Sequence, residues 1–289
     1  MTSRIGLRVS LLRASTVALV LASAGCHWKS AAERSAAPIA EKNAEARGGL
    51  KAWRAVKSMS LAGQLDVGKP RDPVKLAMAY LQTKDEARAQ ARRTLTHGAA
   101  EEAVKTMQLP FVLEMQRPLK TRFELRFQGQ TAVQVFDGKK GWKVRPFLGR
   151  HEVEPFTDEE LRQASQQAEL DGLLIDYASK GSRAELEGTE QVEGRDAYKI
   201  KVTLDNGQVR RVWIDAATFL DVKTDGTRKL DGKLRPVWTA FRDYKPVDGL
   251  MVPHLFETTV EGVKGAERII VERVTLNPTL DESRFAKPD

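Results

Sequence analysis

The sequence predicts a mainly β protein with helices, of the α+β class, in which about ten or eleven strands form an antiparallel meander. Three observations support this prediction. Apolar and polar residues alternate over much of the second half, turn signals separate the alternating segments, and the ~250 residues after the first 37 are a common length for one domain. The turn signals are Asp137-Gly138, Asp205-Asn206-Gly207, Asp225-Gly226, Asp231-Gly232 and Asp248-Gly249.

A helix is predicted over 38–58 and a short strand over 61–67. Pro38 has the fixed φ angle that a first helical turn accepts. Gly48-Gly49 favours a break in the middle of this helix. We expect one globular domain to span 38–289.

Residues 68–108 interrupt the alternation. Two prolines open the segment, and the rest is rich in strong helix formers and poor in strand formers. The composition predicts two helices, over 73–95 and 99–107, separated at His97-Gly98. We interpret the segment as a helical insertion between two strands.

From residue 109 onward, apolar side chains recur at every second position, which predicts strands with one buried and one wet face. The apolar positions of three such strands are Phe111, Leu113 and Met115, then Phe123, Leu125 and Phe127, then Tyr198, Ile200, Val202 and Leu204. Because successive strands usually pair, 61–67 and 109–117 should be neighbours in the sheet despite the insertion between them.

A second helix is predicted over 157–180, inside the meander. Thr157 and Glu160 have the spacing of a capping box, in which each side chain accepts a hydrogen bond from the other residue's backbone N–H. Gly181 suits the end of the helix, and Gly172 offers an earlier break. An apolar stripe at helical spacing, expected to cover part of the sheet, consists of Leu170, Leu173, Leu174 and Tyr177.

The N-terminal residues have the pattern of an export signal. Three arginines and no acidic residue come first, and 14–24 is then almost wholly small or apolar. This run is shorter than the roughly 18 residues of a membrane span. We predict a signal peptide over 1–25 and a flexible tether, rich in Ala and Ser, over 26–37.

The end of this signal resembles the bacterial lipobox, whose cysteine becomes an acylated first residue after cleavage. The residues are Ser23-Ala24-Gly25-Cys26, with Ser23 where the lipobox prefers Leu. The resemblance implies lipidation of Cys26. Several acyl chains hold a protein firmly to a membrane, because each buried methylene contributes ~0.8 kcal/mol. Since His27 and not Asp follows the cysteine, the resemblance further implies sorting to the outer membrane, on its periplasmic face.

Cys26 is the single cysteine of the 289 residues, so it has no internal disulfide partner. Two alternatives to lipidation remain open. One is an ordinary secretory signal cleaved near Cys26, which leaves a free thiol, and the other is an intermolecular disulfide.

Several classes of function are not supported by the sequence. The net charge of +8 is spread over the chain without a basic run between aromatic residues, so no nucleic-acid partner is predicted. No phosphate-binding loop, dinucleotide fingerprint or nucleophile elbow occurs. The four histidines lack the spacing of a metal site, and there is no second cysteine. We predict no catalytic residues, no enzyme activity, no cofactor and no metal.

Landmarks in the second half occur in an order that resembles a known family. They are Gly188, Gly194, Tyr198, Asp215, Tyr244, Val247-Asp248-Gly249, Pro253, Asn277, Phe285 and Pro288. Over about 109–288 and the helix 38–58, the chain resembles the outer-membrane lipoprotein-sorting proteins of the LolA/LolB-like superfamily, as a lipid-anchored member. The resemblance implies a strongly curved, incomplete antiparallel barrel with helices plugging its mouth and an apolar cavity for lipid acyl chains. The insertion at 68–108 departs from the family pattern.

Two functions fit the resemblance. The first is an envelope lipoprotein that binds acyl chains or acylated lipoproteins, for lipoprotein sorting or lipid transport. The second is an envelope stress or ligand sensor on the same fold, with 68–108 as the surface for a protein partner. The residues expected to line an acyl site, each also suited to core packing, are Phe111, Leu113, Met115, Phe123, Leu125, Phe127, Leu170, Leu173, Leu174 and Tyr177.

We expect mass spectrometry of the mature protein to find Cys26 as its first residue, carrying acyl chains. Cys26→Ala should release the domain from the membrane fraction into the soluble periplasmic fraction, because the substitution removes the lipid acceptor. A mature protein that begins elsewhere, or a free thiol at Cys26, would contradict lipidation.

Overall fold

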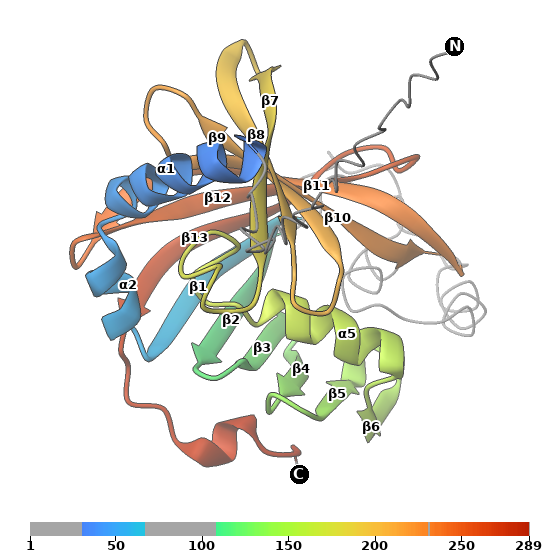
Figure 1. Cartoon of the computed structure of the whole chain (residues 1–289). Coiled ribbons are helices and arrows are strands. Elements are labelled where there is room, and N and C mark those ends of the chain that lie inside the picture. Colours follow the sequence, from blue (N-terminus) through green and yellow to red (C-terminus); the bar gives the residue numbers. More distant parts are fainter. Residues whose placement is uncertain (1–30, 67–107, 231, 289) are drawn as a thin grey trace, which may run out of the picture.

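The computed structural model describes residues 31–66, 108–230 and 232–288. These residues contain thirteen strands in one antiparallel sheet, in the order β6-β5-β4-β3-β2-β1-β13-β12-β11-β10-β9-β8-β7 (Figure 1). The strands are β1 (Ser58–Asp66), β2 (Gln108–Gln116), β3 (Lys120–Phe127), β4 (Gln130–Phe136), β5 (Gly141–Arg145), β6 (Arg150–Pro155), β7 (Arg183–Val192), β8 (Arg195–Thr203), β9 (Val209–Asp215), β10 (Asp221–Leu230), β11 (Lys233–Val247), β12 (Leu250–Val260) and β13 (Glu267–Leu276). The sheet does not close, so β6 and β7 are its edges.

β1 lies in the middle of the sheet, between β2 and β13. It pairs with β2 from Ser58↔Gln116 to Asp66↔Gln108. The predicted pairing of 61–67 with 109–117 is therefore confirmed. The predicted insertion and its two helices lie outside the described residues, apart from Gln108, which opens β2.

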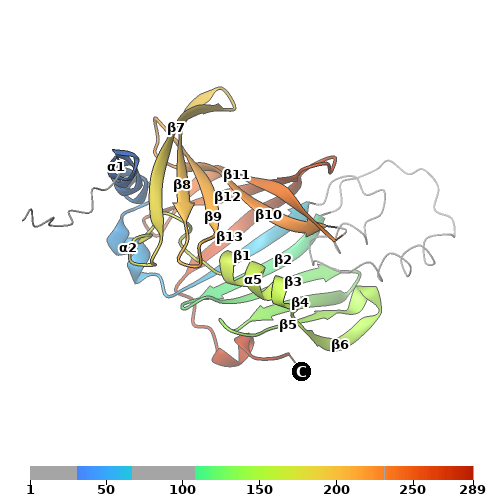
Figure 2. The same cartoon turned by 45° about the vertical axis from the view of Figure 1, so that its right-hand side comes forward.

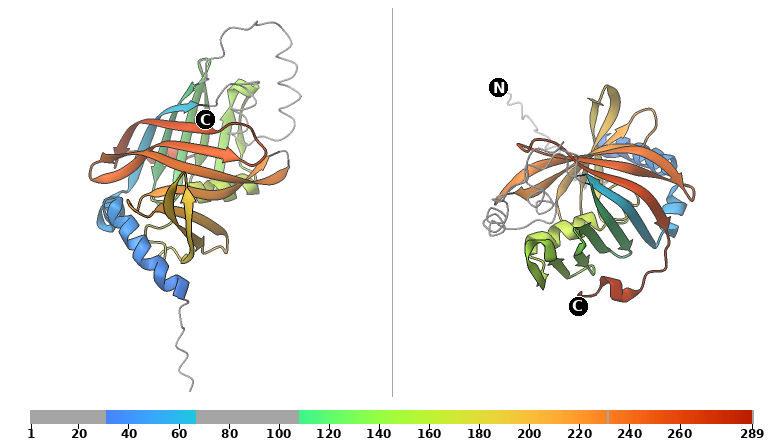
Figure 3. Two further views of the ribbon diagram at one scale, coloured as in Figure 1. Left: turned by 90° about the horizontal axis from the view of Figure 1, so that it is seen from above. Right: turned by 180° about the vertical axis from the view of Figure 1, so that it is seen from behind.

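The sheet is strongly curved, so that β3–β6 and β7–β10 stand at opposite ends of an open trough (Figures 2 and 3). A bulge between Ala62 and Gly63 shifts the register of β1 against β13, and bulges bend strands. A Cβ atom on Gly63 would lie 2.0 Å from the carbonyl oxygen of Ile270, so glycine is required at this point of the β1–β13 pairing.

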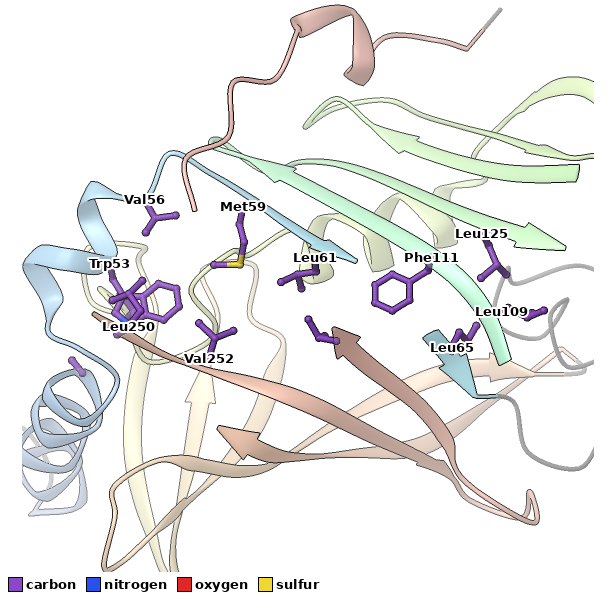
Figure 4. Close-up of a cluster of buried hydrophobic side chains, with 13 residues drawn as sticks. Trp53, Val56, Met59, Leu61, Leu65, Leu109, Phe111, Leu125, Leu250 and Val252 are labelled. Carbon is purple, nitrogen blue, oxygen red and sulfur yellow. The ribbon is translucent and has the colours of Figure 1, made fainter. Parts of the chain in front are cut away.

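The two faces of the sheet differ in chemistry. We call inner the face that carries Leu61 and Leu65 of β1 and the residues paired with them in register, and outer the opposite face. The inner face holds the main apolar core, drawn in Figure 4. The outer face carries ion pairs such as Arg211–Glu187 and Arg242–Glu257. This alternation agrees with the predicted buried and wet faces.

The predicted helix over 38–58 is two helices, α1 (Ala31–Ala46) and α2 (Leu50–Ala55). They part where the glycine pair predicted a break. Gly48 has a φ of 108°, and a Cβ atom there would lie 2.3 Å from the carbonyl oxygen of Gly249. Glycine therefore lets the chain turn against the β11–β12 hairpin.

α1 begins seven residues earlier than predicted, so that Pro38 lies inside it. Ala36 and Ile39 are buried against β7–β9, and this tertiary packing stabilises the helix beyond its own propensity. The tether predicted over 26–37 is therefore wrong for 31–37, which are helical. The signal peptide, Cys26 and the rest of the tether lie outside the described residues.

The helix predicted over 157–180 is shorter. α5 (Asp158–Gln167) begins with the predicted capping box, because Thr157 Oγ1 accepts from the N–H of Glu160 and the Glu160 carboxylate accepts from the N–H of Thr157. The prediction is wrong beyond Gln167. Gly172 and Asp176 have φ angles of 81° and 53°, which a right-handed helix does not allow.

Residues 169–181, which we call the bridging segment, join α5 to β7. Leu170 and Ile175 pack against the cluster formed by β1–β3, β12, β13 and α2. Leu173, Leu174 and Tyr177 pack against a second cluster, formed by α1 and β7–β9. The segment therefore connects the part of the inner face around β1 to the part formed by β7–β9. The predicted plugging of the mouth by helices is not confirmed, because this segment is irregular.

A buried carboxylate holds the bridging segment in place. Asp171 is 1% exposed, and its two oxygens accept from Arg117 Nη2 at 2.6 Å and from Lys180 Nζ at 2.5 Å. Arg117 also donates from Nε to the carbonyl of Val56, at the end of α2. Asp171 thereby links the segment to the turn before β1.

Arg47 reinforces the same junction. Its Nη1 donates to the backbone oxygen of Asp171 at 2.9 Å, and its guanidinium lies 4.5 Å from the ring centroid of Trp53. The indole of Trp53 donates back to the carbonyl of Arg47. The exposed Arg54 pairs with Asp176 farther along the bridging segment.

The C-terminal residues pack on the outer face. The 3-10 helix η2 (Glu282–Phe285) buries Phe285, and Arg284 pairs with Glu114 of β2 and Glu124 of β3. A further 3-10 turn, η1 (Pro146–Leu148), connects β5 to β6. No helix in the described part of the chain combines the length and the apolar character that crossing a bilayer requires.

Replacement of 70–106 by a short Gly/Ser loop should leave the domain cooperatively folded. Asp66 and Gln108 are paired residues, so their Cα atoms lie close together and a short loop can join them. Urea unfolding followed by circular dichroism would measure this. The same loop in place of 169–181 should abolish cooperative unfolding, because it removes the bridge between the two clusters. Loss of cooperativity in the first variant would contradict the prediction.

Asp171→Asn should lower the free energy of unfolding by about 2–3 kcal/mol, because the substitution removes the charge that Arg117 and Lys180 bind in a buried site. Asp176→Asn is the matched control, since its partner Arg54 is exposed, and it should have a much smaller effect. The urea unfolding midpoints of the two variants and the wild type would measure these losses of stability. Equal midpoints for the two variants would show that Asp171 is not the main link.

Candidate functional site

The inner face brings the six predicted strand residues together. Leu113 lies in register between Leu61 of β1 and Phe123 of β3, and Phe111 lies opposite Leu125. Their order along each strand puts Met115 and Phe127 on the same face. The residues of the predicted stripe contact this face through the bridging segment rather than through a helix.

The ten predicted residues divide by exposure. Phe111, Met115, Leu125 and Leu174 are at most 6% exposed, which makes them core residues. The half-buried ones, which keep surface available for a ligand, are Leu113, Phe123, Phe127, Leu170, Leu173 and Tyr177. Strand periodicity alone does not distinguish packing residues from candidate lining residues. The exposure of each side chain does.

Half-buried apolar residues continue the inner face on both sides of β1. We call the apolar wall the set Leu113, Phe123, Phe127, Phe147, Phe256, Ile269 and Val274. Phe127 and Phe147 meet edge to face, with ring centroids 5.9 Å apart. Across the wall, Ile269 lies opposite Leu65 on one side and opposite Phe256 on the other.

Sequence reasoning missed the part of the wall formed by β12 and β13. Phe256 continues the alternation of the buried residues Val252 and His254, and this pattern could have identified it. Phe147 carries no such signal, because it lies in η1, where strand periodicity does not apply.

A polar band borders the wall at the far end of β10–β13. One register row places Thr224, Thr239, Thr258 and Glu267 side by side. The hydroxyls of Thr239 and Thr258 lie 2.9 Å apart, and Arg228 binds both oxygens of Glu267 at 2.9 Å. The hydrogen-bonding groups of this band are largely satisfied within the protein.

Two buried cations lie at the other margin of the wall, on β5. Lys143 is in register with Gln134, which is in register with Phe123. This cross-strand row therefore leads from Phe123 of the apolar wall to the ammonium group of Lys143. Lys143 is 5% exposed and pairs with Glu160 of α5. Arg145, two residues along the strand, is 2% exposed and pairs with Glu154 of β6.

The surroundings of Lys143 and Glu154 shift the pKa values of both groups. Burial lowers the pKa of Lys143, and the nearby charge of Arg145 lowers it further, while Glu160 acts in the opposite direction. For Glu154, burial opposes ionisation, but the hydrogen bond and charge of Arg145 hold the pKa of its carboxyl below the ordinary value. Arg145 Nε has no hydrogen-bond partner among the described residues, although it is buried.

The chemistry of the inner face is suited to binding. Among the described residues, no three His, Cys, Asp or Glu side chains are grouped so that they could hold a metal ion. The inner face instead offers apolar side chains bordered by hydroxyls at one margin and cations at the other. Such a surface fits an amphiphile.

No protein-family model and no curated protein sequence matches the chain. Solved structures do match it. One is a domain described as an outer membrane lipoprotein-sorting protein from Vibrio parahaemolyticus, with 12% identity and a TM-score of 0.51 over 88% of this chain and 97% of that one. Another is a LolA superfamily protein from Nitrosomonas europaea, with 14% identity and a TM-score of 0.51 over 87% of this chain and 97% of that one.

A DUF1329 family protein from Desulfovibrio piger matches to the same extent, with 12% identity and a TM-score of 0.52 over 88% of this chain and 97% of that one. The three structures agree with the open, curved antiparallel sheet. The chain therefore has a LolA-like fold.

Proposed function

We propose that the protein binds lipid acyl chains, free or as part of acylated lipoproteins, against the apolar wall of the inner face. The observation that carries the proposal is the position of the wall. Its seven residues are half-buried and apolar, and they lie on the face that the bridging segment spans. Side chains that only filled a core would be expected to be fully buried, as Leu125 is.

The energetics of an acyl chain suit a surface of this kind. Burying a chain from water contributes ~0.8 kcal/mol per methylene, but moving it from a bilayer to a protein contributes little. A protein that takes lipid from a membrane and releases it again therefore needs a modest apolar surface. This supports transfer or sorting of lipids and lipoproteins as the role, in keeping with the LolA-like fold.

The proposed place of action is the cell envelope. A lipid on Cys26 would hold the domain at the periplasmic face of the outer membrane, and the signal pattern of 1–25 supports export. The fold similarity to a lipoprotein-sorting domain supports the same compartment. Acyl chains or acylated lipoproteins would then be the partners.

Substitution of the inner face should separate ligand binding from stability. Leu113→Gln places an amide on the wall and should weaken binding of a fluorescent fatty acid to the delipidated protein roughly tenfold, because less apolar surface is buried in the complex. Val112→Gln is the matched control. Val112 is its neighbour on β2, is also half-buried, and faces Ala62 and Glu124 on the outer side.

Fluorescence titration and urea unfolding of both variants would test the proposal. The two variants should have similar unfolding midpoints, with binding weakened only in Leu113→Gln. Wild-type protein that takes up no fatty acid, or equal loss of binding in both variants, would rule out the inner face as the acyl site.

A further inference from the structure

Lys143 and Arg145 are difficult to explain by packing alone. Both project from the inner face of β5 at the margin of the apolar wall, and both are buried. Placing two cations side by side in a protein interior is unfavourable unless each is fully paired and hydrogen-bonded. The residues around them supply two carboxylates, Glu160 and Glu154.

The pairing is incomplete at Arg145. Its Nη2 binds Glu154, whereas its Nε has no acceptor in the part of the chain that the structure describes. Buried donors in folded proteins nearly always have a partner, and a lone N–H on a charged group is among the costlier exceptions. Glu154 is also shared, since Arg150 lies 3.6 Å from the same oxygen. One more anionic acceptor would complete the site.

The polar band at the opposite margin contrasts with this site. Arg228 binds both oxygens of Glu267, and Arg210 donates to the backbone oxygen of Asp225 and to Thr224. Arg228 and Arg210 therefore have hydrogen-bond acceptors within the protein, unlike Nε of Arg145. Of the two margins of the wall, the one at β5 is therefore where an anion would be bound.

We propose that Arg145, with Lys143 beside it, binds the anionic head of an acyl ligand, a carboxylate or a phosphate, whose chain lies along the apolar wall. The inference rests on the proposed function and adds the chemical class of the ligand. The row Phe123, Gln134, Lys143 leads from the wall to the cations. The incoming anion accepts from Nε and competes with Glu154 for the guanidinium, while Glu154, which is 31% exposed, keeps Arg150 as a partner.

The experiment compares photo-crosslinking of paired probes to the full chain in phosphatidylcholine nanodiscs. One pair is a diazirine-bearing fatty acid and the matching fatty alcohol. The other pair is a diazirine-bearing lysophosphatidic acid and the matching monoacylglycerol. Each pair shares its chain and differs in the charge of the head. The ratio of crosslinked protein within a pair, corrected for the probe in the membrane, reports the preference for an anion.

The wild type should favour the anionic probe of at least one pair by about tenfold, the effect expected of one charge-assisted hydrogen bond in a buried site. A preference in the first pair alone identifies a carboxylate, and one in the second alone identifies a phosphate. Crosslinks should map to β2–β5 and the bridging segment.

Two variants should move this preference in opposite directions. Arg145→Met should reduce it towards unity, because the binding donor is lost. Glu154→Gln should increase the preference for the anionic probe, because the competing carboxylate is lost while every cation remains. If Arg145→Met does not fold, Glu154→Gln alone tests the head site. The control is Arg211→Met, which removes an arginine paired with Glu187 on the outer face and should change nothing.

The outcomes distinguish this inference from the proposed function. If no probe crosslinks to the inner face of the wild type, the proposed function fails and the head site with it. If the probes crosslink there but each pair gives equal yields, the acyl site stands and the head site is wrong. A preference that Glu154→Gln leaves unchanged, or that Arg211→Met also removes, likewise overturns the head site.

Discussion

The buried carboxylate of Asp171 anchors the segment that connects the two parts of the open sheet. Because β6 and β7 do not pair, no backbone hydrogen bonds join the two ends of the trough among the described strands. The connection is the bridging segment, whose side chains enter both apolar clusters. Asp171 fixes that segment through Arg117 and Lys180, and Arg47 adds a bond to its backbone. The geometry of the inner face therefore depends on this junction.

Local physical signals account for the parts of the fold that could be predicted from the sequence. The alternation of Phe111, Leu113 and Met115 identified both the strand and its apolar face, and the capping box at Thr157 located the start of α5. The ends of helices were harder to predict. α1 extends past Pro38 because of packing against β7–β9. α5 stops before an apolar stripe of helical spacing, because Gly172 and Asp176 within that stretch have positive φ angles. Tertiary contacts and backbone conformation decided both cases.

The candidate site was predictable only in part, for a related reason. Periodicity shows which face a residue occupies but not how much of it remains exposed. Leu125 and Phe127 are equivalent in the pattern, yet one is fully buried and the other forms part of the wall. The margins of the wall depend on pairing between strands far apart in the sequence. Nothing near Arg145 in the sequence indicates that its neighbours across the sheet are apolar.

The position of β1 determines when the fold can be completed. Its two neighbours are β2, which follows it in the chain, and β13, the last strand, more than two hundred residues away. Before β13 is synthesised, the strands can form only two separate sheets, one with β1–β6 and one with β7–β12, because β13 is the strand that pairs with both. Pairings this distant in sequence are also slow to form, because a large loop must close first. The nascent protein therefore cannot complete its sheet until β13 has been synthesised.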